Sequence, residues 1–126
     1  MKRGRSTGTP TAAQAARFEA IREIGCLACR QANRRWTAAE IHHLTVGGRH
    51  GQKRRGHDYT IGLCGWHHRS ERPFHVTPGQ MRHWYGPSYA LEPRQFRETF
   101  GQDDALLAEQ EQLLAEAGFK SEDEAA

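Results

Sequence analysis

The stretch "AEIHHLTVGGRHGQKRRGHDYTIGLCGWHHRS", residues 39–70, carries six of the eight histidines in this 126-residue chain. Apolar residues on either side of the segment "VGGRHGQKRRG", residues 46–56, predict two short strands over 39–45 and 59–63. The segment between them has four glycines and four basic residues, which indicates a cationic loop. From Trp66 onward a short helix is expected, which Pro73 stops. The sequence therefore predicts two strands joined by a basic loop and followed by a helix.

The composition describes one small, polar domain. Hydrophobic residues make up 37% of the chain and the mean hydropathy is −0.85, so the core is small and a metal or a disulfide is expected to stabilise it. Three cysteines cannot all pair with one another, no apolar run follows the basic residues at the N-terminus, and no segment reaches membrane-spanning length. We therefore predict a cytoplasmic protein in a reducing environment, where CxxC more often serves metal or redox chemistry.

Charge is distributed unevenly along the chain. Residues 1–100 contain 17 Lys and Arg against 7 Asp and Glu, whereas residues 101–126 contain 1 against 8. A basic body of this kind suggests a polyanionic partner, and the acidic end suggests a solubilising or partner-binding appendage. Charge alone leaves open the alternative that the arginines only solvate the surface.

The chain is predicted to have three parts. Residues 1–10 form a disordered basic arm, residues 11–101 form the domain, and residues 102–126 form an acidic helix and tail. Within the domain, Thr11 is expected to cap a helix that reaches Ile24, and Thr77 a helix that reaches Gly86; residues 93–100 form another. Trp66 and Trp84 are expected in the core. In "DDALLAEQEQLLAEAG", residues 103–118, leucines recur seven residues apart, so this helix packs on the domain or on another protomer.

Two short motifs predict a structural zinc site. Each motif forms a knuckle, a tight turn that presents two ligands. The two knuckles, Cys26-x-x-Cys29 and Cys64-x-x-His67, together offer three thiolates and one imidazole, a set that tetrahedral zinc accepts at closed structural sites. A redox role for CxxC would need a thioredoxin-like pattern of strands and helices, which is not present in the sequence. A buried thiol cluster without metal is the remaining alternative. Zinc binding is expected to supply much of the folding free energy.

The other histidines predict a second, catalytic centre. His67 and His68 would point about 100° apart on a helix, so His68 can face a different site from its neighbour. Two histidine pairs that flank one basic loop favour phosphodiester hydrolysis assisted by a single divalent ion, although lone histidines are often filler. A neutral imidazole suits the role of general base at physiological pH. Phosphate oxygens would be bound by the side chains of Lys53, Arg54, Arg55 and Arg69.

This arrangement resembles the HNH endonuclease superfamily, whose core is called ββα-metal or His-Me finger. In that pattern a strand ends in a metal ligand followed by the general base, which Ile41-His42-His43 matches. The resemblance thus implies that His42 binds the catalytic ion and that His43 is the base. The family's "LCxxCH" turn reads Leu63-Cys64-Gly65-Trp66-His67-His68 here, which implies that His67 replaces a zinc-binding cysteine and that His68 binds the catalytic ion. The implied fold is α+β, a small zinc-stapled core with flanking helices, and the ion is Mg²⁺, Mn²⁺ or Zn²⁺.

The chain departs from the superfamily pattern at two positions. The middle Asn of the motif falls at Tyr59, which His57 and Asp58 precede, so His57 and Tyr59 are both candidates for a catalytic role. His57 is also a candidate for a phosphate contact. The further ligand that usually follows the helix is assigned to His75, with Glu71 as the alternative.

Within the superfamily the chain is most similar to the phage recombination-enhancement group, called Ref-like, whose members act with the RecA recombinase. The similar stretches are "IHHLTVGG", "GHDYTIGLCGWHHR" and "HWYGPSYALEPRQFRETFG", within residues 22–101. The resemblance implies a phage-encoded or bacterial DNA endonuclease that works inside the bacterial cell, with DNA and a RecA filament as partners. The alternatives are a non-catalytic zinc-ribbon module that binds nucleic acid and, less favoured because the chain has no translocation domain, a secreted nuclease toxin.

Overall fold

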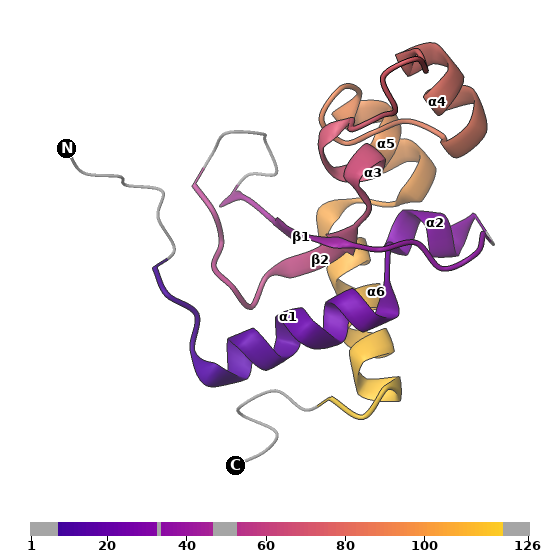
Figure 1. The fold of residues 1–126 in the computed structure, drawn as a ribbon. Helices are drawn as coiled ribbons and strands as arrows, with labels where there is room; N and C mark the ends of the chain where they lie inside the picture. Colours follow the sequence, from indigo (N-terminus) through magenta and orange to yellow (C-terminus); the bar gives the residue numbers. More distant parts are fainter. Residues whose placement is uncertain (1–7, 33, 47–52, 120–126) are drawn as a thin grey trace.

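The computed structural model describes residues 8–32, 34–46 and 53–119 (Figure 1). The predicted disordered arm and acidic tail lie largely outside the described residues, as does the central part of the basic loop. The two-stranded sheet lies at the centre, α1 runs beneath it, and α3, α4 and α5 gather at one end (Figure 1). The α+β fold class predicted from the sequence is confirmed.

The sheet consists of β1 (Glu40–His43) and β2 (Thr60–Leu63), paired antiparallel. The register places Glu40 opposite Leu63 and His43 opposite Thr60. An isolated bridge between Thr45 and Arg54 continues the pairing toward the basic loop. Because successive side chains of a strand alternate between faces, Glu40 and His42 lie on one face of β1 and His43 on the other.

Helix α1 (Ala12–Ile24) covers one face of this sheet. Thr11 and Gln14 form a capping box at its first turn, as the predicted cap requires, and Gly25 ends it with a φ of 91°. The strand accepts the helix closely because Gly62 has no side chain: a Cβ there would lie 2.8 Å from Ile21. Buried Arg17 joins the same two elements, since its guanidinium donates to the side chain and the main-chain oxygen of Thr60 over 2.9 and 2.7 Å.

Helices α2 (Leu27–Gln31) and α3 (Gly65–Arg69) are single short turns, each with a cysteine as its N-cap. The sequence predicted only a knuckle where α2 lies. α3 was expected to continue until Pro73 but ends at Ser70, which adopts a left-handed conformation with a φ of 64°. The hydroxyl of Ser70 contacts that of buried Ser88 at 2.7 Å, which fixes this early end of the helix.

The remaining helices complete the core. They are α4 (Pro78–Tyr85), α5 (Pro93–Phe100) and α6 (Asp103–Glu116). Phe96 and Leu106 are fully buried, whereas Trp84, expected in the core, is 45% exposed. The expectation for Trp84 was wrong because α4 turns Met81 and Tyr85 toward the core and leaves Trp84 facing outward.

The last helix packs on the domain itself. α6 contacts α1 and β2, and Leu106 and Leu114 are buried. The side-chain oxygen of Gln110 accepts a hydrogen bond from the main-chain nitrogen of Gly62 over 2.9 Å, and Glu111 pairs with Arg17 at 2.6 Å. None of the described helices is long and apolar enough to cross a membrane.

Candidate functional site

Three cysteines and a histidine converge where α2 and α3 begin. Nδ1 of His67 lies 3.5 Å from the sulfur of Cys26, 3.7 Å from that of Cys29 and 3.2 Å from that of Cys64. The sulfurs of Cys29 and Cys64 are 3.9 Å apart. All four donor atoms lie within 4.8 Å of one another, and all four residues are buried. Two motifs that are far apart in the sequence thus form one cluster that could hold a metal ion.

The geometry of this cluster fits zinc. A tetrahedral zinc with sulfur at about 2.3 Å and nitrogen at about 2.0 Å keeps its ligand atoms about 3.5–3.8 Å apart, close to the observed separations. Nε2 of His67 lies 2.8 Å from the main-chain oxygen of Tyr85, which can only accept, so this nitrogen carries the proton. Nδ1 faces the sulfurs, so its lone pair would be directed at a metal ion bound among them.

The thiols of the cluster ionise unequally. Hydrogen bonds from Cys26 and Cys64 hold the pKa of Cys29 well below its usual range. Hydrogen bonds with Cys29 and Cys64, together with burial, raise the pKa of Cys26. The lowered pKa favours the thiolate form of Cys29, and binding of a divalent cation would displace the remaining thiol protons.

His43 and His57 form a hydrogen-bonded pair at the loop end of the sheet. Nε2 of His43 lies 3.0 Å from Nδ1 of His57, and Nε2 of His57 lies 2.8 Å from the main-chain oxygen of Gly8. Because the carbonyl only accepts, His57 carries its proton on Nε2 and accepts at Nδ1. His43 must then carry its own proton on Nε2, which leaves the lone pair on Nδ1.

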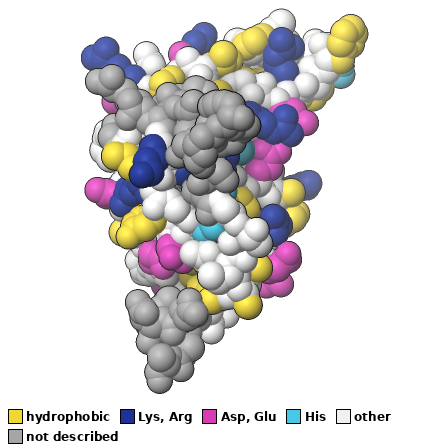
Figure 2. All heavy atoms as spheres, turned by 90° about the vertical axis from the view of Figure 1, so that its left-hand side faces the viewer, with side chains coloured by type: hydrophobic (Ala, Val, Ile, Leu, Met, Phe, Trp, Pro, Cys, Tyr) yellow, Lys and Arg dark blue, Asp and Glu magenta, His cyan; other side chains and the backbone are white. Residues whose placement is uncertain are grey.

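The surroundings keep His43 neutral. Burial and the nearby guanidinium of Arg54 lower the pKa of His43 to about 4. Phe18 of α1 packs edge-on against both imidazoles, with ring centroids 6.0 Å from His43 and 5.5 Å from His57. Figure 2 shows the face that lies on the left of Figure 1, where histidine side chains reach the surface near the centre among charged groups of both signs. A neutral imidazole in such a setting can accept a proton.

A second pair of imidazoles lies on the opposite face of β1. The rings of His42 and His68 are 5.0 Å apart, centroid to centroid, and meet edge to face. Nδ1 of His68 lies 2.8 Å from Oε1 of Glu40, whose other oxygen is 2.8 Å from the guanidinium of Arg69. The guanidinium of Arg69 holds the pKa of Glu40 below its usual range, so the carboxylate accepts and His68 donates from Nδ1. Nε2 of His68 thereby has its lone pair directed away from Glu40.

The sequence reading missed two residues that shape this pair. Glu40 lies two residues before His42 and therefore on the same face of the predicted strand, a signal that could have identified Glu40. Tyr89 packs its ring 4.6 Å from that of His42, and its hydroxyl accepts from Arg97 over 2.5 Å. Burial is the main cause of the raised pKa of Tyr89, so this phenol stays protonated. No local pattern points to Tyr89, because it comes from the loop between α4 and α5.

Comparison with known protein families shows the family of this chain. A family model described as "Recombination enhancement, RecA-dependent nuclease" matches residues 10–115. The chain belongs to this family. A comparison with curated proteins gave no match. The matched range contains the Cys₃His cluster and both histidine pairs, so these features lie within the part of the chain that matches the family.

The four basic residues predicted to bind DNA have different surroundings. Lys53 and Arg54 are exposed. Arg55 pairs with Asp104 at 2.9 Å and stacks 4.6 Å above the ring of Tyr59, a residue that the sequence reading considered catalytic. Arg69 pairs with Glu40 and, at 3.3 Å, with Glu71. Two of the four predicted phosphate contacts therefore have carboxylate partners within the domain.

The third predicted ligand of the catalytic ion stands apart from the other two. His75 is exposed in the loop between α3 and α4, and Glu71, the alternative, is 57% exposed and paired with Arg69. Within residues 8–32, 34–46 and 53–119, the Cys₃His cluster alone gathers three or more metal-binding side chains within 4.8 Å. His42 and His68 thus provide two neighbouring imidazoles, and the assignment of His75 stays a prediction.

Proposed function

We propose that this member of the RecA-dependent nuclease family is a metal-dependent DNA endonuclease of HNH type. The observation that carries the proposal is the hydrogen bond between His43 and His57 beside the His42–His68 pair, with one pair on each face of β1. The order β1, β2, α3 matches the strand–strand–helix unit of that superfamily. One short strand thereby provides a proton acceptor and a metal ligand at consecutive positions.

His43 would act as the general base. Its Nδ1 lone pair would take a proton from the attacking water, while His57 fixes the ring through Nε2 and stabilises the charge that His43 acquires. His57 would in this way take the role of the middle Asn of the superfamily motif. This chain lacks that Asn and has Tyr59 at the corresponding position of the sequence. A bound phosphate would offset the charge of Arg54 and raise the pKa of His43 toward neutral pH, where a base works best.

His42 and His68 would hold the catalytic divalent ion. Glu40 orients His68 through Nδ1, which is the arrangement in which carboxylates commonly support metal-binding histidines. The ion, Mg²⁺, Mn²⁺ or Zn²⁺, would supply a positive charge for the phosphate oxygens. His75, from the loop after α3, is the proposed further ligand, and Glu71 is the alternative.

The basic side chains around the pair would bind the DNA backbone. Lys53 and Arg54 are exposed near the loop end of the sheet, and the charge of Arg54 already acts on His43. Arg55 would exchange its carboxylate partner for a phosphate. Arg69 would bind a phosphate through Nη1, which Glu40 does not use. Such contacts position the backbone and read no sequence. Dependence on a RecA filament rests on the family description alone.

Cleavage assays on supercoiled plasmid and on RecA-coated DNA test the proposal. The parent protein with Mg²⁺ or Mn²⁺ should nick or cut DNA, and His43→Ala should lose at least about 100-fold in rate while it still folds and binds zinc. His83→Ala is the matched control, because His83 is an exposed histidine on α4, and it should cleave normally. A parent protein that binds DNA without cleaving it, with or without RecA, would favour the zinc-ribbon binding module.

A further inference from the structure

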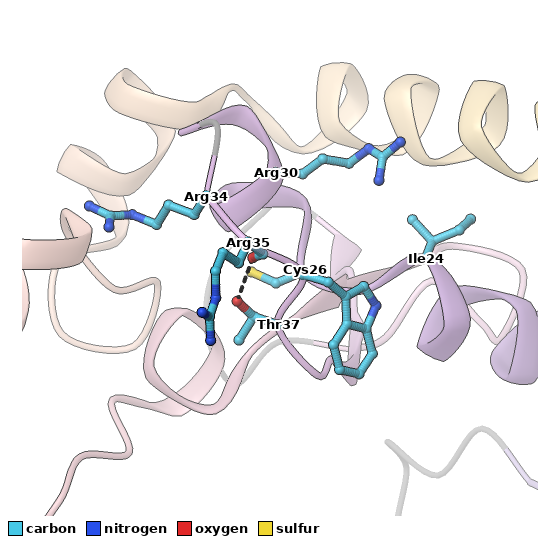
Figure 3. A pocket seen from close by; sticks show the side chains of 7 residues that line it. Ile24, Cys26, Arg30, Arg34, Arg35 and Thr37 are labelled. Carbon is cyan, nitrogen blue, oxygen red and sulfur yellow. Dashed lines mark hydrogen bonds between the residues drawn. The ribbon is translucent and has the colours of Figure 1, made fainter.

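A second group of basic residues lies around the Cys26-x-x-Cys29 knuckle. We propose that the pocket formed by Arg30, Arg34, Arg35 and Trp36 binds single-stranded DNA, with a base stacked on Trp36 and neighbouring phosphates on the arginines. None of these residues belongs to the metal-binding or base-forming sets described above. Ile24, Cys26 and Thr37 complete the lining (Figure 3).

The pocket is lined by positive charge without a carboxylate. Three arginines and no acidic side chain surround it. Arg17, Arg55 and Arg69 pair with carboxylates elsewhere in the domain. Within the described part of the chain, by contrast, no carboxylate forms an ion pair with Arg30 or Arg35. Figure 3 shows the side chains of these arginines extended around the knuckle, so their donors are available to a phosphate.

Trp36 is an exposed but fixed aromatic surface. Its side chain is 63% exposed, although tryptophan is usually well buried. Its indole nitrogen donates to the main-chain oxygen of Glu23 over 3.0 Å. The ring edge lies directly on Gly25, where an added Cβ would come within 2.7 Å of the indole. A ring that is held at one edge and open on its face suits base stacking, because little conformational entropy remains to be lost.

The framework around the pocket is also ordered. The guanidinium of Arg34 donates to the main-chain oxygen of Trp84 and lies 4.9 Å above the ring of Tyr85. The hydroxyl of Thr37 donates to the main-chain oxygen of Arg35 over 3.2 Å (Figure 3). Cys26 ties the floor of the pocket to the Cys₃His cluster. The cavity volume, about 90 Å³, is well below the range of small-molecule sites, so the pocket can receive only a small part of a larger ligand.

The pocket is close to the proposed catalytic centre. Three residues lie between Trp36 and Glu40, so their Cα atoms, four steps apart along the chain, are at most about 14 Å apart. Glu40 orients His68, and a strand bound at Trp36 would therefore lie within a few nucleotides of the His42–His68 pair. This step, unlike the binding itself, rests on the proposed function. Exposed aromatic rings between phosphate-binding arginines favour single strands, whose bases are free to stack, over duplex DNA.

Equilibrium binding of a fluorescent oligothymidylate of about 20 nucleotides tests the proposal. All proteins carry zinc and the His43→Ala change, and no other divalent ion is added, so that cleavage does not interfere. Trp36→Leu should weaken binding at least about fivefold, whereas Trp36→Phe should retain most of the affinity. Arg30→Ala and Arg35→Ala should each lower the slope of log affinity against log salt by about 0.7.

Two controls match these changes. Phe74→Ala removes a fully exposed aromatic ring, and Arg94→Ala removes an exposed arginine on α5; both should bind as the parent does. Affinity for a duplex of the same length should change less than about twofold in Trp36→Leu. Either of two results with the variants would overturn the proposal: equal losses of affinity for duplex and single-stranded DNA, or parental affinity in Trp36→Leu and Arg35→Ala. So would tighter binding of oligouridylate than of oligothymidylate, or displacement of the oligonucleotide by polyglutamate as effectively as by DNA.

The outcome is separable from that of the proposed function. Cleavage by the protein with His43 intact tests the catalytic assignment, and binding in the His43→Ala background tests the pocket. Because Trp36→Leu removes a contact with Gly25, zinc content and helical circular dichroism are measured for every variant. The exposed arginine changes give an answer even if Trp36→Leu fails to fold.

Discussion

Nε2 of His43 lies 3.0 Å from Nδ1 of His57, which in turn is anchored through its other nitrogen to the main-chain oxygen of Gly8. This chain of contacts determines the proton positions on both rings and leaves Nδ1 of His43 as the acceptor. The relationship joins the end of β1 to the turn before β2 and to the start of the described chain. Its consequences can be tested one residue at a time.

Replacement of His57 should separate positioning from chemistry. In His57→Leu the ring of His43 loses its acceptor, so we expect the cleavage rate to fall by roughly 10- to 100-fold, by analogy with the loss of other orienting partners. In His57→Gln the side-chain oxygen can still accept from Nε2 of His43, and part of the rate should return. Cleavage rates with saturating Mn²⁺ measure both effects. Equal activity of the two variants would argue that His57 only fills space beside Phe18.

Titration of His43 should be displaced to low pH. Since its pKa in the folded protein is lowered to about 4, from an ordinary value near 6.5, the ring should remain neutral at pH 6. The unfolded chain takes up this proton first as the pH falls, so the free energy of unfolding should decrease between about pH 6.5 and pH 4. Histidine ring signals in nuclear magnetic resonance spectra, recorded on zinc-loaded protein without added divalent ions, report the midpoint.

Arg54 provides the control for this titration. Burial is the larger cause of the shift and Arg54 the next, so Arg54→Ala should move the midpoint of His43 upward without restoring the ordinary value. Arg94→Ala removes the same charge from an exposed position on α5 and should leave the midpoint in place. A midpoint near 6.5 in the parent protein would contradict the burial of the ring.

The zinc cluster should be required for folding. Cys64→Ser removes one of four buried donors, and a structural zinc contributes on the order of 10 kcal/mol in small zinc domains, so the variant should lose zinc and unfold. Elemental analysis and circular dichroism measure the two losses together. His43→Ala should keep one tightly bound zinc per chain and a nearly unchanged melting temperature. A folded Cys64→Ser protein without zinc would show that apolar packing alone maintains the domain.

Local signals in the sequence predicted the framework well. Thr11 and Thr77 each cap a helix where the sequence predicted a cap. The CxxC and CxxH spacings identified the four ligands of the cluster, because each short motif fixes the geometry of one turn. The contacts between distant residues were harder to foresee. Nothing near Trp36 indicates that its ring lies on Gly25, and nothing near Tyr89 indicates that it packs on His42. Such contacts depend on how the helices assemble, which periodicity does not encode.

Glu40 combines a position that the sequence predicts with contacts that depend on the assembled fold. The sequence places it two positions before His42, on the same strand face, but its partners come from α3, 28 and 29 residues later. Arg69 binds the same carboxylate and holds the pKa of Glu40 below its usual range. Neither contact follows from the pattern of β1 alone, because both require the register that α3 takes beside the sheet.

Glu40→Gln should therefore weaken the proposed catalytic metal site without harming the fold. The amide accepts a weaker hydrogen bond from His68 and loses the ion pair with Arg69, so the Mn²⁺ concentration for half-maximal cleavage should rise by roughly 10- to 100-fold. Glu19→Gln, at an exposed carboxylate paired with Arg22, is the matched control and should leave the metal dependence unchanged. Zinc content should be the same in both variants, because Glu40 is not a member of the Cys₃His cluster. A Glu40→Gln protein with parental Mn²⁺ dependence would mean that His68 does not need its carboxylate, and the assignment of His68 as a ligand would lose its main structural support.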